Sequence, residues 1–221
     1  MTRHPDSPAG VQRLDVFSVI RDRSSVRSFL PDPIPMTLVQ QAIEAAGWAP
    51  SPHGTQPWRF AVIASRERRF RLAEAMAEVW RAQLRMDGTP ESVVEHRLAR
   101  SRERLETAPV VVVLCLFLGE AHEYADDARQ EAERVMAIQS LGAAAQNFLL
   151  ALHALGLDAG WMCAPLFNPE TVRTTLGLDS SLIPHAMFPV GRMNQPPKRR
   201  PRRPLETLIA LWDDGDDEAP I

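Results

Sequence analysis

The segment EAERVMAIQSLGAAAQNFLLALHALGL, residues 131–157, is the stretch that decides the fold. Its apolar side chains recur at steps of three and four, the spacing that places side chains on one face of a helix. They are Val135, Ile138, Leu141, Ala145, Phe148, Leu152 and Leu155. The opposite face is scarcely more polar, because Asp, Glu, Lys and Arg are absent from 135–157. A helix that is apolar nearly all round is enclosed by protein or by lipid. The segment therefore predicts one long, buried central helix.

Polar residues inside this segment favour a protein environment over a lipid one. A membrane-spanning helix needs about 20 predominantly apolar residues. Here the apolar run is interrupted by Gln139, Ser140, Gln146, Asn147 and His153. Gly142 and the alanines at 143–145 form a small-residue patch where another backbone or a flat ligand can approach closely. The patch is consistent with tight core packing and with a dimer interface, and the sequence leaves both open.

Length and composition indicate an ordinary globular protein. The chain has 221 residues, 45% hydrophobic content and a net charge of -3. This length fits one large domain, and the negative net charge argues against a general nucleic-acid binder. The first ten residues, MTRHPDSPAG, lack an apolar stretch of signal-peptide length, so a cytoplasmic protein without a membrane partner is expected. Cys115 and Cys163 have no metal-ligand spacing, and no metal site is predicted.

Helices and strands alternate loosely along the chain. A short helix is expected around Leu14, Phe17 and Ile20, and a second from a Thr37/Gln40 capping box to about Gly47. Further helices are expected at Arg66–Met86 and Glu91–Leu105, and a short one that Asn168 can cap and Gly177 ends. Strands are expected at Phe60–Ala64, Val110–Phe117, Gly160–Ala164 and Leu182–Gly191. The pattern predicts a single α+β domain over 1–212, with a helical excursion at 66–105 and a disordered acidic tail at 213–221.

The chemistry-bearing residues are cations and hydroxyls rather than nucleophiles or metal ligands. The sequence has no G-x-G-x-x-G, no Walker A loop, no G-x-S-x-G and no H-E-x-x-H motif. Its six histidines are scattered. What remains is RDRSSVRSF at 21–29, the loop WAPSPHGTQPWRF at 48–60 and a basic, proline-rich run at 192–204. Such clusters suit an anionic, planar cofactor that carries the chemistry itself.

Three of these stretches resemble the FMN-dependent nitroreductase family. RSSVRSF at 23–29 is similar to the family's opening Arg-x-Ser-x-Arg/Lys-x-Phe, and APSPHGTQPWRF at 49–60 is similar to its Pro-Ser loop that ends in Gln-Pro-Trp-x-Phe. The central helix followed by ALGLDAGWMCAP at 154–165 resembles the helix and strand behind the flavin. The resemblance covers the chain from about Phe17 to Trp212. It implies a nitroreductase-like fold, with a central, mostly antiparallel sheet flanked by helices in an intertwined homodimer.

Within the family, PSPHG, the charged helices at 66–105 and the VGR…RRPLE ending look most like the flavin-binding C-terminal domain of the bifunctional coenzyme F420 biosynthesis enzyme. That resemblance implies reduction of a dehydro precursor of F420, with a general NAD(P)H-dependent nitro or quinone reductase as the alternative. The related dimethylbenzimidazole synthases share the Gln-Pro-Trp-Arg-Phe loop, but Ser25 replaces the Asp of their opening motif. Phe167 stands where an acidic residue is frequent in the family, which leaves the substrate open.

The resemblance also assigns the FMN site. The cofactor-binding candidates are Arg23, Ser24, Ser25, Arg27, Ser51, His53, Gln56, Pro165, Leu166, Arg200 and Arg202. Arg23, Ser25 and the two tail arginines would hold the phosphate, and Arg27 would lie at the N1/O2 edge of the ring. The loop residues would touch the ring or ribityl chain, and Pro165 with Leu166 would back the ring. No protein side chain is assigned as catalytic, because flavin N5 accepts the hydride, with NAD(P)H or reduced F420 as the expected donor. A flavin-free module that binds polyanions through its basic ends is the remaining alternative.

Overall fold

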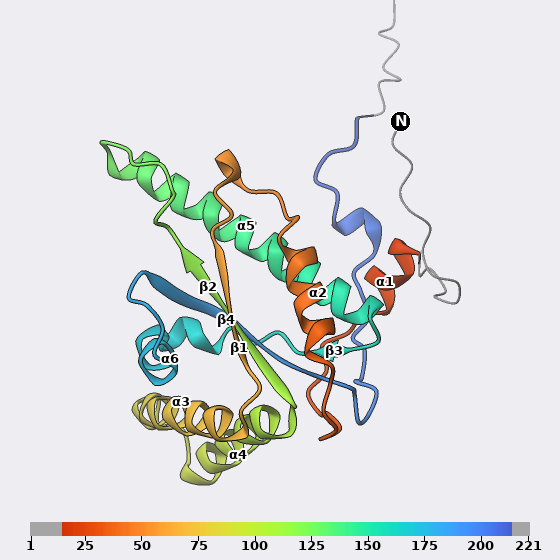
Figure 1. Ribbon diagram of the computed structural model, residues 1–221, viewed down its shortest axis with the longest axis vertical. Coiled ribbons are helices and arrows are strands. Elements are labelled where there is room, and N and C mark those ends of the chain that lie inside the picture. The colour runs from red at the N-terminus through yellow and green to blue at the C-terminus, as the bar shows by residue number, and fades with distance from the viewer. Residues whose placement is uncertain (1–14, 214–221) are drawn as a thin grey trace, which may run out of the picture.

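The computed structural model describes residues 15–213, which fold into three layers with a sheet between two groups of helices (Figure 1). On one face lie α1 (Val16–Asp22), α2 (Met36–Ala46) and α5 (Asp127–Ala154), and on the other lie α3 (Arg66–Met86), α4 (Glu91–Thr107) and α6 (Pro169–Leu176). This confirms the expected class, an antiparallel sheet flanked by helices. Residues 1–14 of the predicted domain and all but Asp213 of the predicted acidic tail at 213–221 lie outside the described residues.

The sheet has the strand order β1-β2-β4-β3, and every neighbouring pair is antiparallel. Its strands are β1 (Trp58–Ile63), β2 (Val110–Phe117), β3 (Asp158–Ala159) and β4 (Leu182–Gly191). Trp58 pairs with Leu116 near the end of β2, whereas Val110 at its start pairs with Val190. The segments that precede β1 and follow β4 therefore lie at opposite ends of β2.

β2 separates two hydrophobic cores by the alternation of its side chains. Its even-numbered residues from Val110 to Leu116 pack against α2 and α5, in a core centred on Phe148 and Phe188. Val111, Val113 and Cys115 face the other way, toward α3 and α6. Both faces are therefore covered by helices, which is why the strand is apolar at every position.

The long helix α5 is buried on one side and open on the other. Leu141, Ala145, Phe148 and Leu152 are buried against the sheet and α2, as expected, but Val135 is 41% exposed. A Cβ added at Gly142 would meet no other atom within 4 Å, so this part of the small-residue patch faces away from the core. An 18-residue window of the helix has a mean hydropathy of 1.4, which is enough to match a membrane span by length and composition alone. Its packing on the sheet explains that composition, and its outer face remains available to a partner.

The hairpin of α3 and α4 is the helical excursion between β1 and β2. It has a small core of its own, built from Ala77, Leu84, Val94 and Leu98. The buried guanidinium of Arg69 joins the two ends of the excursion: it donates hydrogen bonds to the carbonyl of Ala64, just after β1, and to the carbonyl of Pro109, just before β2. The hairpin is thus closed at its base by one side chain.

Three local expectations were wrong. The Thr37 capping box does not form, because α2 begins at Met36 after Pro35 and no side chain caps it. The predicted strand at 160–164 is reduced to a single bridge between Met162 and Met187, followed by the 3₁₀ turn Ala164–Phe167, in which Pro165 interrupts the extended backbone. Asn168 precedes α6, but its side chain does not cap the helix.

Candidate functional site

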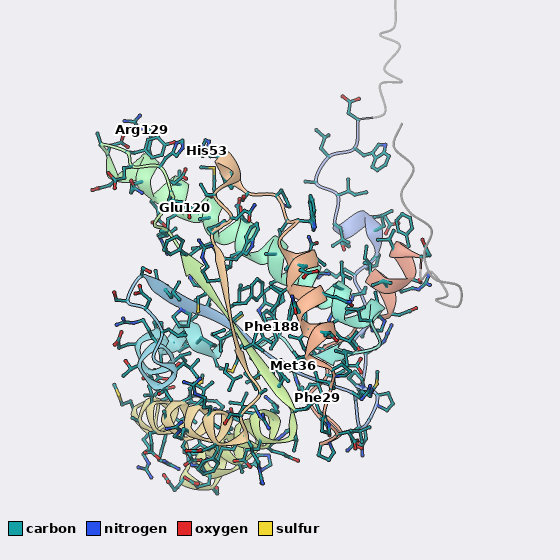
Figure 2. All side chains as sticks on the ribbon, viewed as in Figure 1. Phe29, Met36, His53, Glu120, Arg129 and Phe188 are labelled. Carbon is teal, nitrogen blue, oxygen red and sulfur yellow. The ribbon has the colours of Figure 1, made fainter. Side chains whose placement is uncertain are left out.

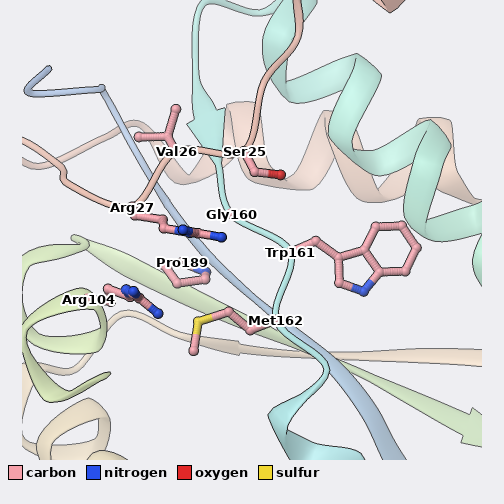
Figure 3. Close-up of a pocket in the computed structure, with 8 residues that line it drawn as sticks. All are labelled: Ser25, Val26, Arg27, Arg104, Gly160, Trp161, Met162 and Pro189. Atoms are coloured by element: carbon pink, nitrogen blue, oxygen red, sulfur yellow. The ribbon is translucent and has the colours of Figure 1, made fainter. Parts of the chain in front are cut away.

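A narrow pocket lies where the segment after α1 crosses the segment after β3. It is lined by Ser25, Val26, Arg27, Arg104, Gly160, Trp161, Met162 and Pro189. Figure 3 shows the side chains of Arg27 and Arg104 entering this space from two different elements, with Met162 and Trp161 on the opposite side. Two cations therefore border a hollow that is otherwise largely apolar.

A close approach of two backbones builds this pocket. Ser25 forms a bridge with Ala159, and the Val26 amide donates to the Ala159 carbonyl at 3.0 Å. Gly160 makes the approach possible, since a Cβ there would lie 2.4 Å from the Val26 carbonyl oxygen. The Gly160 amide donates to the Pro189 carbonyl at 3.1 Å, which fixes the segment against β4. The glycine thus lets 23–27 lie directly against the sheet.

Arg104 was missed by the sequence reasoning. Burial lowers the pKa of its guanidinium, and the positive charges of Arg27 and Arg100 lower it further. Across residues 15–213, neither Arg27 nor Arg104 has a carboxylate within 4.0 Å. Two neighbouring cations without a counter-ion favour a bound anion or a carbonyl-rich edge between them. The only sequence signal of Arg104 was its position next to the end of the expected helix Glu91–Leu105, where an arginine is typical of a solvated helix surface.

A second cationic cluster surrounds Arg23 at the end of α1. Burial lowers the pKa of Arg23, and the charges of Arg202 and Arg199 add to the effect. The Nε atom of Arg23 is buried and has no hydrogen-bond partner in the described chain. Arg199 is held in place by the Arg21 carbonyl at 3.0 Å and the side chain of Asp22 at 3.9 Å. An orphaned guanidinium N–H near two further arginines fits a phosphate group.

The tail reaches this cluster along its own subunit. The Leu30 amide donates to the Arg192 carbonyl at 2.9 Å, and the Asn194 amide donates to the Ser28 carbonyl at 3.0 Å. The segment 192–199 therefore packs on its own chain, so any crossing to a partner starts after Arg199. Both tail arginines expected at the phosphate are exposed, but only Arg202 lies close enough to Arg23 to lower its pKa. Arg199 is a further member of the cluster that the sequence reasoning did not include.

The loop that carries Ser51, His53 and Gln56 is not part of the same pocket. The Ser51 hydroxyl accepts a hydrogen bond from the Gln56 amide at 3.1 Å, and both His53 and Gln56 have positive φ values. The His53 ring stacks on His122, with ring centroids 3.9 Å apart. This loop precedes β1, whereas Phe29, two residues beyond the pocket's Arg27, lies at the other end of the molecule (Figure 2). Within one chain, therefore, the predicted loop and cluster residues are not brought together.

Pro165 and Leu166 lie just beyond the pocket. They belong to the 3₁₀ turn Ala164–Phe167, which packs against β4. Pro165 is buried, while the side chains of Leu166 and Phe167 are 49% and 74% exposed. Trp161, which starts this stretch, packs edge-on against Phe188 at a centroid distance of 5.7 Å. The turn presents an apolar surface next to the two cations.

The fold and the paired cationic clusters define a class of protein, the oxidoreductases built on an antiparallel sheet between helical layers. The chain belongs to the nitroreductase family, because the sequence model of that family matches residues 20–192. It is 28% identical to an NADH dehydrogenase of Thermus thermophilus, over 90% of this chain and 96% of that protein.

Solved structures agree with this assignment. A protein described as a nitroreductase from Desulfovibrio desulfuricans, in complex with FMN, is 27% identical, with a TM-score of 0.70 over 91% of this chain and 99% of its own. A BluB-like flavoprotein from Clostridium difficile 630 has a TM-score of 0.77 at 23% identity, over 91% of this chain and 100% of its own, which shows the shared fold.

Proposed function

We propose that this protein is an FMN-dependent oxidoreductase that uses a reduced nicotinamide dinucleotide to reduce a small organic acceptor. The observation that carries the proposal is the buried, unpartnered Nε of Arg23, a side chain whose pKa is lowered by the nearby charges of Arg202 and Arg199, at one end of the 23–27 segment. Arg27 and Arg104 form a separate cationic pair at the other end of that segment. FMN carries a phosphate dianion at one end and a carbonyl-bearing ring at the other, so it matches both clusters.

Each cluster has its own task in this proposal. Arg23, Arg199 and Arg202 bind the phosphate, with the hydroxyls of Ser24 and Ser25 as further donors and Arg200 as a candidate that the tail could bring in. Arg27 and Arg104 border the N1/O2 edge of the ring, where fixed cations stabilise the charge of the reduced state. When bound, FMN accepts a hydride at N5 from the donor and passes two electrons to the acceptor. The apolar turn of Pro165 and Leu166 backs the ring and excludes water.

A second subunit completes the site. The loop with Ser51, His53 and Gln56 lies at the opposite end of β2 from Arg27, so it reaches a flavin ring only in a partner chain. The surface also carries many large exposed apolar side chains: Val16, Phe17, Ile20, Trp48, Leu205, Leu208, Leu211 and Trp212. Exposed apolar groups on this scale mark a protein interface. We therefore propose a twofold homodimer with the FMN sites at its interface.

The acceptor is proposed at two levels. Reduction of nitroaromatic or quinone compounds follows from the family and from the NADH dehydrogenase relative. Reduction of a dehydro precursor of F420 is the narrower proposal, and it is supported by the PSPHG loop and the charged hairpin. Arg81 and Arg85 of the hairpin are engaged by carboxylates and are not free to bind this ligand, because Arg81 pairs with Glu78 and Glu95 and Arg85 pairs with Glu91.

The test begins with the absorbance of the purified protein and mass spectrometry of the released cofactor. We expect an oxidised-flavin spectrum that bleaches under anaerobic NADH, and recovery of colour when an acceptor is added. Nitroaromatic, quinone and dehydro-F420 acceptors are compared in parallel for the rate of reoxidation. A colourless protein that stays free of flavin after incubation with FMN would refute the proposal, and DNA binding with a steep salt dependence would then favour the polyanion-binding alternative.

A further inference from the structure

Arg97, Arg100 and Arg104 lie along one side of α4 and form an arginine stripe. With 3.6 residues per turn, the side chains at 97 and 104 project in almost the same direction from the helix axis. The three residues span roughly 10 Å along that axis. Arg104 at one end lines the pocket beside Arg27. Arg97 and Arg100 are exposed, so the stripe leads from the pocket to the surface.

Three other arginines of α3 and α4 behave differently. Arg81 pairs with Glu95 at 3.2 Å, Arg85 pairs with Glu91 and Arg102 pairs with Glu74, each at 2.5 Å. In the part of the chain that the structure describes, the three stripe arginines have no carboxylate within 4.0 Å. Glu103 is the acidic residue nearest in sequence, and its charge affects Arg104 less than Arg27 and Arg100 do. Arg81, Arg85 and Arg102 are thus neutralised, whereas the stripe arginines, like Arg66 and Arg68 at the start of α3, have no such partner among the described residues.

An unpaired stripe is a cost to the fold rather than a contribution to it. Like charges one turn apart on a helix destabilise it by a few tenths of a kcal/mol per pair. The overall charge of the chain is -3, so the stripe is a local departure from the general surface. Forked guanidinium groups in a row match the spaced oxygens of phosphates. A ligand whose one end lies beside the pocket and which carries phosphates outward would follow the stripe.

We propose that Arg97 and Arg100 bind the pyrophosphate of the nicotinamide dinucleotide donor while its nicotinamide ring lies against the flavin, outside the narrow pocket that Arg27 and Arg104 border. The inference rests on the proposed function and specifies how that site selects its donor. It assigns Arg104 to the flavin end of the stripe and the two exposed arginines to the donor. A donor without phosphates gains nothing from them.

The test uses the FMN-loaded protein and the double variant Arg97→Gln/Arg100→Gln. We expect KM for NADH to rise about tenfold or more, with kcat changed less than about twofold, since each lost arginine removes a charge-assisted contact. KM for 1-benzyl-1,4-dihydronicotinamide, a neutral donor without phosphates, should stay the same. The matched control is Arg71→Gln/Arg85→Gln, which removes the same charge from α3 and should leave both KM values unchanged.

Three results would overturn the inference: an unchanged KM for NADH, an equal rise with the neutral donor, or an equal rise in the control variant. An effect confined to an anionic acceptor would also overturn it, because the stripe would then serve the oxidant. Calorimetric titration with NAD⁺ tests the stripe even if turnover is absent, and the double variant should bind NAD⁺ more weakly than the unmodified protein does. Absence of flavin and of turnover with every donor would refute the proposed function instead.

Discussion

Arg104 shows how one residue changes the electrostatics of the pocket. It enters from α4, far in sequence from Arg27, and the two side chains border the same space. Burial lowers the pKa of Arg104, yet the group stays charged because an arginine guanidinium is protonated far above neutral pH. A second fixed cation at the ring edge should stabilise reduced flavin beyond what Arg27 achieves alone.

Replacing Arg104 should therefore make the bound flavin harder to reduce. Arg104→Gln removes a contact worth about 1.5–3 kcal/mol to a charged partner, which corresponds to a fall of roughly 30–60 mV in the two-electron potential. Potentiometric titration of the bound FMN measures this fall in potential. Arg102→Gln serves as the control, since Arg102 pairs with Glu74 toward α3. Equal potentials in the two variants would show that Arg104 does not reach the ring.

His185 on β4 should give the protein an acid-sensitive stability. Burial lowers the pKa of His185 below its ordinary value of 6.5, and the charge of Arg134 lowers it further. The unfolded chain then binds the proton more readily, so stability falls as pH drops below about 6.5 and is retained above it. His185→Gln should flatten the decline in the urea midpoint between about pH 7 and pH 5. An unchanged slope in the variant would assign that decline to other groups.

At the scale of elements, α5 has an outer face that only a partner can cover. Gly142 has open space around its Cβ position, so a larger side chain meets nothing in its own subunit. If a second copy packs there, Gly142→Leu should give a folded monomer with unchanged far-ultraviolet circular dichroism and weakened FMN binding. Light scattering gives the mass, and Ala82→Leu, an exposed position on α3, is the control. A dimeric Gly142→Leu protein would place the interface elsewhere.

The elements that the sequence predicted well are those with one dominant pattern. The predicted bounds of β2, β4 and α3 match the structure: β2 is an unbroken apolar run, β4 a mostly apolar one, and α3 a charged amphipathic helix. The strand at 160–164 was wrong because Gly160 and Pro165 serve a backbone crossing and a turn, which local pattern does not reveal. Arg104 was missed for a related reason: its meeting with Arg27 depends on tertiary packing, and α4 by itself resembles a solvated helix. The loop with His53 was recognised, but its position relative to Arg27 depends on the sheet register.

At the scale of the whole molecule, the end of the described chain has few contacts with its own subunit. Leu205, Leu208, Leu211 and Trp212 are between 64% and 85% exposed. A chain that ends after Pro204 should therefore show a weaker dimer and weaker FMN binding, because these side chains would lose a partner surface. Sedimentation and flavin titration measure both effects. A chain that ends after Asp213 is the control, since residues 214–221 read DGDDEAPI and carry little apolar surface. Equal behaviour of the two truncations would show that the apolar end does not contribute.

The two hydrogen bonds that Arg69 donates to the carbonyls of Ala64 and Pro109 affect how the length of the α3–α4 hairpin can vary. Because one side chain closes the base of the α3–α4 hairpin, the sheet meets the same two anchor points whatever lies between them. Loop-closure cost grows slowly, by about 0.6 kcal/mol for each doubling of length. The hairpin can therefore vary in length without moving the two points at which it joins the sheet. The part of the hairpin around Ala77, Leu84, Val94 and Leu98 can be lengthened or shortened to suit a different donor or acceptor, while the strands, Arg69 and Arg104 stay where they are.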